Sequence, residues 1–306
     1  MKNFKKLLLL IVVVLTATLS NAQQQVQFSQ YMYNTQMVNP AYAGTQGRLE
    51  AYFIHRSQWV GLEGAPHTQN FGVSGSIHEN LALGLNVVND KIGPANLTMF
   101  NASISSKIAL SKDISLSFGI NGGIDMVNVD WSKGNSMSDN DDAIGNNIKN
   151  RVRPVVGAGL YLYSDNWYFG LSTPSFIHKD KYAKVDEAHI DPKIHLYALA
   201  GYVFYVGENV KLKPTILAKG VRGAPISFDL SLNALFQDKY TAGLGYRYND
   251  AVYLMLGYTF KKSFFIGYSY DMSVTKLRNY NSGSHDIMLK YTLWSKNIGV
   301  VTPRFF

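Results

Sequence analysis

Cysteine is absent from this chain of 306 residues, and charged residues make up only 16% of it. The absence of cysteine excludes disulfide bridges, thiolate metal sites and cysteine nucleophiles. Beyond the first 22 residues no stretch has the roughly 20 apolar residues that a membrane-spanning helix needs. A basic helix and a clustered run of arginines are lacking too, so we expect no nucleic-acid partner.

Residues 1–22 predict a secretory signal peptide. Lys2, Lys5 and Lys6 form its basic region, residues 7–19 are apolar, and small residues precede the expected cleavage before Gln23. The alternative, an uncleaved anchor, is disfavoured because the apolar run is short. Cleavage removes three of the 29 basic residues and leaves 26 against 21 acidic ones, a net charge of +5. Such an excess suits an anionic lipid surface or an acidic protein face.

Apolar and polar residues alternate along many segments of about ten residues. In Ile226–Gln237 the residues Ile226, Phe228, Leu230, Leu232, Ala234 and Phe236 share one face, and polar residues occupy most of the other. Alternation of this kind predicts a strand with one apolar and one polar face. The 20 tyrosines, 16 phenylalanines and 26 glycines suit a barrel with aromatic girdles outside and a crowded interior.

Fourteen such strands can be placed, which gives the even count of an outer-membrane barrel. They are 48–58, 68–77, 81–89, 97–110, 114–130, 151–163, 167–173, 193–206, 210–219, 226–236, 240–248, 251–260, 263–272 and 284–294. A soluble β-sandwich would alternate as well. However, charged residues such as Lys107, Asp229 and Lys290 fall on the polar face, and a basic residue on a lipid face would cost about 2–4 kcal/mol near the midplane. The segregation favours the barrel.

The reversals between strands alternate between two sets. Six are clipped to two or three polar residues: 78–80, 111–113, 164–166, 207–209, 237–239 and 261–262. The other seven are 59–68, 90–96, 132–150, 174–191, 220–225, 249–250 and 273–283. Short periplasmic turns opposite longer extracellular loops are typical of an all-β, transmembrane outer-membrane barrel. We therefore predict a barrel over 47–294, a lumen plug or periplasmic segment over 23–46, and a tail over 295–306.

No motif predicts a catalytic site, a cofactor or a metal. Asp139–Asp142 could offer oxygen ligands to Ca²⁺, but the glycine and the terminal glutamate of an EF-hand loop are missing, and a solvated acidic loop is the preferred interpretation. Gly72–Gly75 lacks one residue of a Gly-x-Ser-x-Gly elbow and lies in a predicted strand. We expect a protein that is not an enzyme.

Several short motifs occur in one order along the chain: Phe28–Tyr31, Asn39–Gly44, Arg56–Gly61, Gly64–Pro66, Asn89–Pro94, Gly157–Gly159, Tyr168–Ser172, Ala224–Pro225, Tyr246–Arg247, Gly267–Asp271 and Gly283–Asp286. Together they resemble the PorP/SprF family of type IX secretion membrane proteins of Bacteroidota. The family usually stops at its last strand, whereas this chain continues through 295–306.

The resemblance implies an outer-membrane barrel that works with subunits of the type IX secretion machinery. It also implies a secreted cargo, typically a cell-surface adhesin with a C-terminal sorting domain, and a role in protein export, surface attachment or gliding motility. Outer-membrane lipid is the remaining expected partner. An outer-membrane channel for small solutes stays open as the alternative, and a membrane hydrolase is remote.

The strand directions place one group of motif residues at the extracellular end of the barrel. The group consists of Arg56, Trp59, Asp90, Lys91, Arg247, Asp271, His285 and Asp286. We expect these residues to form one polar rim that binds a partner. The alternative is a network of Arg–carboxylate pairs that fixes the outer loops, because buried charges must be paired.

Overall fold

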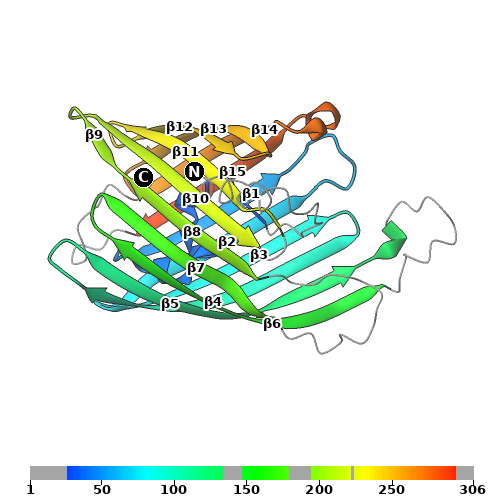
Figure 1. Cartoon of the computed structure of the whole chain (residues 1–306), viewed down its shortest axis with the longest axis horizontal. Coiled ribbons are helices and arrows are strands. Elements are labelled where there is room, and N and C mark those ends of the chain that lie inside the picture. Colours follow the sequence, from blue (N-terminus) through cyan, green and yellow to red (C-terminus); the bar gives the residue numbers. More distant parts are fainter. Residues whose placement is uncertain (1–25, 134–146, 179–193, 222–223, 294–306) are drawn as a thin grey trace, which may run out of the picture.

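A computed structural model describes residues 26–133, 147–178, 194–221 and 224–293 of the chain. One antiparallel sheet contains all the strands (Figure 1). They are β1 (Leu49–Ser57), β2 (His67–His78), β3 (Leu81–Ile92), β4 (Ala95–Ala109), β5 (Ser115–Val129), β6 (Ile148–Tyr163), β7 (Trp167–His178), β8 (His195–Tyr202), β9 (Phe204–Val206), β10 (Val210–Val221), β11 (Ser227–Phe236), β12 (Tyr240–Arg247), β13 (Ala251–Phe260), β14 (Phe264–Ser273) and β15 (Ser284–Leu293).

The sheet closes into a barrel because its first and last strands pair with each other. β1 pairs with β15 over its whole length, and strands that follow each other in the chain pair with each other, except β8 and β9. β8 and β9 both pair with β10 and are separated only by Val203, so they form one interrupted strand. The predicted 14-stranded antiparallel barrel is thereby confirmed.

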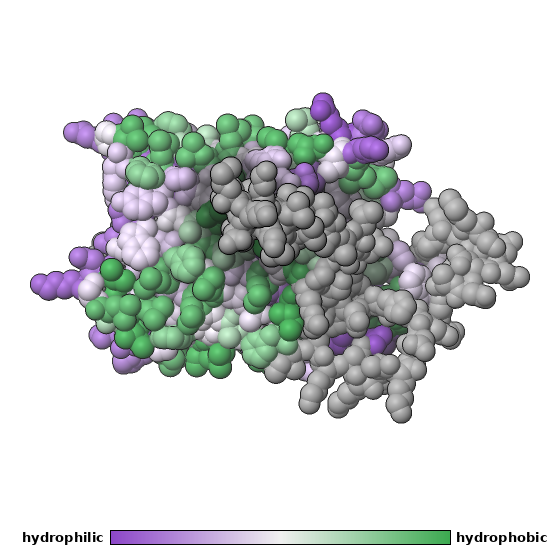
Figure 2. Space-filling model, viewed as in Figure 1, coloured by the Kyte–Doolittle hydropathy of each residue, from purple (hydrophilic) through white to green (hydrophobic). Residues whose placement is uncertain are grey.

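The two faces of the wall divide as the alternation predicts. On β11 the side chains of Phe228, Leu230 and Leu232 are exposed on the outside, whereas Asp229 and its inward-facing neighbours are buried. Figure 2 shows hydrophobic residues over the outer face between two ends that carry hydrophilic ones. This outer face suits a hydrocarbon environment, and the closed sheet leaves no unpaired strand edge.

The two ends of the barrel differ in their connections. At the short-turn end lie the reversals after β2, β4, β7, β9, β11 and β13, with consecutive positive φ angles at Gln237–Asp238 and Lys261–Lys262 that fit tight hairpin turns. The long-loop end carries the other reversals, including 58–66 and 274–283. The reversal predicted over 90–96 is corrected: β3 and β4 extend until only Gly93-Pro94 connects them.

Residues 26–48, here called the N-terminal segment, lie inside the barrel. They form three short helices, η1 (Tyr31–Tyr33), α2 (Thr35–Val38) and η2 (Pro40–Tyr42). Two further 3₁₀ turns, η3 (Trp131–Lys133) and η4 (Lys276–Tyr280), belong to the loops. In the described part of the chain no helix is long and apolar enough to cross a membrane. The hydrophobic core joins Phe28, Tyr31 and Tyr42 of the segment to tyrosines of the wall.

Candidate functional site

A cluster of buried charges lies inside the barrel near its long-loop end. We call it the mouth network; its members are Ser29, Arg56, Asp229, Arg247, Asp271 and Asp286. None of these side chains is more than 4% exposed. They come from the N-terminal segment, β1, β11, β12, β14 and β15, and each wall residue lies within two residues of the strand end at the long loops.

Two guanidinium groups organise the carboxylates of the mouth network. Arg56 Nη1 lies 2.5 Å from Asp286 Oδ1, and Arg56 Nη2 lies 2.9 Å from Asp271 Oδ2. Arg247 Nε donates to Asp229 Oδ2 at 3.0 Å, and Arg247 Nη1 lies 3.4 Å from Asp271 Oδ2. Asp271 therefore connects the two arginines into one network, and the paired charges offset the cost of their burial.

Ser29 ties the N-terminal segment to four charged residues at once. Its backbone N–H donates to Asp286 Oδ2 at 3.0 Å, and its hydroxyl donates to Asp271 Oδ2 at 2.6 Å. The same hydroxyl accepts hydrogen bonds from Arg56 at 3.3 Å and from Arg247 at 3.1 Å. Hydrogen bonds to charged groups are stronger than neutral ones, so Ser29 is a strong anchor for the segment.

The N-terminal segment supplies neutral hydrogen-bond donors to the carboxylates of the mouth network. Three buried carboxylates face two guanidinium groups, and Asp250, which also pairs with Arg247, is 42% exposed in its side chain. Neutral donors supply the remaining stabilisation: Ser29, the hydroxyl of Tyr253 on Asp229, and Gln27 Nε2 at 3.4 Å from the same carboxylate. Withdrawal of the segment would remove the donors of Ser29 and Gln27 from buried carboxylate oxygens, whereas Tyr253 of β13 would stay in place.

The remainder of the segment packs against a part of the wall where glycines make room for it. We call residues 36–44 and the strands against them the glycine seat. A Cβ atom added at Gly119 of β5 would collide with the backbone of Ala41, and one at Gly159 of β6 would collide with Asn39. Glycine at these positions lets the two backbones approach closely.

Neutral hydrogen bonds complete the glycine seat. Ser105 Oγ donates to the carbonyl of Ala43 and Ser172 Oγ to that of Val38, each at 2.6 Å, while Asn39 Nδ2 donates to the carbonyl of Leu160 at 2.9 Å. Between the two anchors the hydroxyl of Tyr31 lies 2.7 Å from Thr215 Oγ1. Burial raises the pKa of this phenol, and so does the charge of Asp229, which keeps the hydroxyl protonated.

The structure brings together four of the eight residues predicted at the extracellular rim: Arg56, Arg247, Asp271 and Asp286. Asp90 is buried elsewhere in the lumen and accepts a hydrogen bond from Thr68 at 2.6 Å. His285 and Lys91 point to the outside of the wall, and Trp59 lies in the loop after β1 with a φ of 46°. The eight residues therefore do not form a single cluster.

Sequence reasoning missed three contributors to the mouth network, namely Ser29, Asp229 and Tyr253. Asp229 could have been found, because it lies opposite Arg247 in the hairpin of β11 and β12. Ser29 lies 242 residues from Asp271 and 257 from Asp286. Periodicity along the chain carries no signal for such distant contacts.

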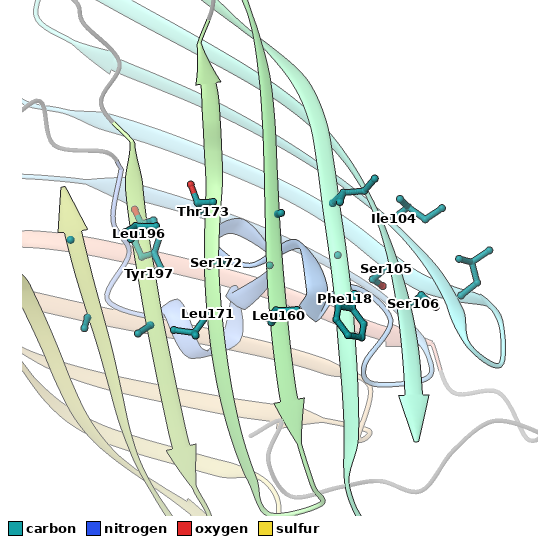
Figure 3. Close-up of a pocket in the computed structure, with 18 of the residues that line it drawn as sticks. Ile104, Ser105, Ser106, Phe118, Leu160, Leu171, Ser172, Thr173, Leu196 and Tyr197 are labelled. Carbon is teal, nitrogen blue, oxygen red and sulfur yellow. The ribbon is translucent and has the colours of Figure 1, made fainter. Parts of the chain in front are cut away.

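An apolar groove of about 980 Å³ runs along the outside of β4–β8 (Figure 3). Its exposed side chains include Phe118, Leu160 and Leu171, which face away from the lumen, and the helices of the N-terminal segment lie behind this wall. The groove belongs to the apolar outer face. No group of three or more His, Asp or Glu residues in the described chain can hold a metal ion. The acidic loop 139–142 lies outside the described residues.

A family model described as type IX secretion system membrane protein PorP/SprF matches residues 20–291. The chain belongs to the PorP/SprF family. This membership confirms the resemblance drawn from the motifs, and it implies association with the type IX secretion machinery. No curated protein matches the chain.

Solved structures similar to this PorP/SprF chain are outer-membrane barrels. The toluene transporter TbuX of Ralstonia pickettii superposes with a TM-score of 0.52 at 8% identity, over 87% of this chain and 93% of its own. The monoaromatic hydrocarbon channel CymD gives a TM-score of 0.49 at 12% identity, over 87% and 92% of the two chains. At such identities the likeness shows the fold alone. The protein is an outer-membrane β-barrel.

Proposed function

We propose that this barrel is a non-enzymatic partner of the type IX secretion machinery that holds a secreted protein at the cell surface. The proposed cargo carries a C-terminal sorting domain and is of the adhesin type. One observation carries the proposal: the N-terminal segment occupies the lumen and is fixed at both ends. A lumen filled in this way does not suit free passage of solutes. The loops are then the surface that would meet a partner.

Three connections at the long-loop end form one continuous surface, which we call the collar: 58–66, 93–94 and 274–283. The backbone N–H of Val60 donates to the carbonyl of Gly283 at 2.8 Å, and Ser282 N–H donates to the carbonyl of Val60 at 2.7 Å. Gly93 N–H donates to the carbonyl of Gly64 at 2.9 Å. These bonds hold the collar in a defined shape, which lowers the entropy cost of binding.

The collar and the residues that border it combine exposed apolar groups with positive charges. The side chains of Val60, Leu62, Ile92, Val274 and Tyr280 are exposed, the last of them by 70%. Lys91, Lys276 and Arg278 are exposed beside them. Aromatic and basic residues next to apolar ones are typical anchors of protein interfaces. The collar therefore fits a protein partner with an acidic and apolar surface.

The test begins with the tagged barrel in its native outer membrane, from which the co-purifying secreted protein is identified. Trp59→Ala with Lys91→Ala, and separately Tyr280→Ala, should lower the amount of that protein retained on the cells. Lys112→Ala with Lys239→Ala at the short turns is the control, because it removes more positive charge at the opposite end. A shift in gel migration between unheated and heated samples of each variant checks that the barrel is folded.

Unchanged retention in the collar variants together with loss in the short-turn variants would contradict the proposal. The binding face would then lie at the periplasmic end, and the protein would act with a machinery scaffold. A solute channel remains the second candidate only if the intact barrel conducts, and the first prediction of the Discussion measures this.

A further inference from the structure

The outward face of the barrel becomes polar near the long-loop end across five neighbouring strands. Across β15, β1, β2, β3 and β4 the paired residues His285, Ser57, His67, Lys91 and Asn96 form one row. The row beneath it contains His55, Gln69, Asn89 and Thr98 on β1–β4, whereas its member on β15 is the apolar Ile287. We call these two rows the outer polar band.

The next row toward the short turns is apolar. It consists of Leu289, Phe53, Phe71, Val87 and Phe100, which pair with one another across the same five strands. The change from hydrocarbon-compatible to polar side chains therefore takes place within one step along the strands. Such a step marks the level at which lipid chains end and head groups begin.

Two histidines of the outer polar band make hydrogen bonds through Nδ1 to hydroxyl groups on the same outer face. His285 Nδ1 lies 2.7 Å from the hydroxyl of Tyr268, and His67 Nδ1 lies 3.3 Å from Ser57 Oγ. The Nε2 atoms of both rings are thereby left for a ligand. Lys91 is exposed and makes no ion pair within the described residues.

No carboxylate shares the outer polar band. Asp90, Asp271 and Asp286 lie at the same level, but their side chains face the lumen and are at most 6% exposed. The nearest outside carboxylate along the chain is Glu63, in the collar loop after β1. A lysine and histidine donors with no carboxylate in the same two rows form a surface that attracts anions.

The opposite side of the barrel lacks this composition. On β11–β14 the outward residues near the same end are Phe228, Tyr246, Val252 and Met272, all of them exposed and none of them charged. A general girdle would surround the whole barrel, whereas these outward residues of β11–β14 carry no charge. The polar row continues from Asn96 only to Asn128 of β5 and to β6, where Lys149 is exposed.

We propose that the outer polar band binds the phosphate group of a glycolipid of the outer leaflet, with Lys91 as the charge partner and His67 and His285 as hydrogen-bond donors. The site lies at the height of the head groups because the row beneath it is apolar. This inference goes beyond the proposed function: the band faces the membrane, and of its residues only Lys91 is also among the cations beside the collar.

The test uses the full-length barrel in nanodiscs of phosphatidylcholine with added diphosphoryl lipid A, and native mass spectrometry counts the bound lipid A. The wild-type barrel should retain it. The variant Lys91→Gln, His67→Gln, His285→Gln should bind at least about tenfold more weakly, as expected for the loss of charged hydrogen bonds. Lys112→Gln, Lys239→Gln, Lys261→Gln at the short turns is the matched control and should bind as the wild type does.

Two further binding measurements distinguish the phosphate of a glycolipid from free inorganic phosphate. Dephosphorylated lipid A should bind no better to the wild type than to the triple variant, and inorganic phosphate should not displace diphosphoryl lipid A. Equal binding by wild type and variant, or displacement by inorganic phosphate, overturns the proposal. Because a triple variant can fold poorly, Lys91→Gln and Lys91→Arg are measured alone; only the arginine should keep the affinity. No arm involves the cargo, so failure here leaves the proposed function untouched.

Discussion

At the long-loop end the N-terminal segment meets the barrel wall through charges, whereas at the glycine seat it meets the wall through glycines and neutral hydrogen bonds. Ser29 contacts four charged residues in the mouth network. Ala41 and Asn39 lie where any side chain at Gly119 or Gly159 would collide. One anchor depends on hydrogen bonds to buried charges and the other depends on shape.

The difference determines how each anchor can be released. A network of buried charges fails as a unit, because one missing partner leaves the others uncompensated. The glycine seat can lose its hydrogen bonds one at a time, because each neutral hydrogen bond contributes only about 0.5–1.5 kcal/mol. A partner that approaches from the long-loop end would therefore meet the anchor that is easier to switch. We therefore expect any release of the segment to begin at the mouth network.

Deletion of residues 25–43 removes both anchors and should produce the largest effect. The intact protein should conduct poorly in planar bilayers, because the segment occupies the lumen, and the deletion should open a steady pore. Ser29→Asp is a second variant that retains the segment but adds a carboxylate to the mouth network, and it should give intermittent openings. Steady large conductance by the intact protein would favour a solute channel.

Arg56→Met tests the charged anchor in isolation. The substitution leaves Asp271 and Asp286 without their common cation, and breaking a buried pair in this way should cost about 3–5 kcal/mol of unfolding free energy. Urea unfolding in detergent micelles measures the loss. Lys211→Met is the control, because its partner Asp238 is 66% exposed in its side chain and the pair should contribute about 0–1 kcal/mol.

Equal losses for Arg56→Met and Lys211→Met would mean that the mouth network is open to water. Asp271→Asn offers an independent check, because it leaves part of the charge of Arg56 and Arg247 unpaired without a change of shape. It should also destabilise the barrel by about 3–5 kcal/mol.

Gly119→Ala tests the shape-dependent anchor. The new methyl group would collide with the backbone of Ala41, and we expect overpacking to cost about 1–3 kcal/mol. Gly122→Ala on the same strand is a matched control: a Cβ there meets nothing within 4 Å, so its effect should stay within about 0.5 kcal/mol. The same urea titration compares the two. A loss in both variants would point to a general effect on β5 instead of contact with the segment.

The sequence predicted the wall well and the mouth network only in part, for physical reasons. A lipid face and a lumen face impose a period of two, which is local and therefore readable on each strand. The hairpin at Gly93-Pro94 was misjudged because Asp90, Lys91 and Asn96 suggest a loop, although they lie on β3 and β4. Ser29 was missed as a member of the network because its partners lie more than 200 residues away in the sequence.

The last prediction compares two serine hydroxyls, one from each anchor, and the loss expected for Ser172→Ala is the smallest among the substitutions that test the anchors. Ser29→Ala removes hydrogen bonds to charged groups and should cost about 1.5–3 kcal/mol, whereas Ser172→Ala removes one bond to the carbonyl of Val38 and should cost about 0.5–1.5 kcal/mol. The double variant should show nearly additive losses, because the sites have no partner in common. Urea unfolding of the two single variants and the double variant measures both quantities. If Ser172→Ala costs more than Ser29→Ala, the glycine seat is the dominant anchor, and partners at the long-loop end would not control the segment by acting on the mouth network.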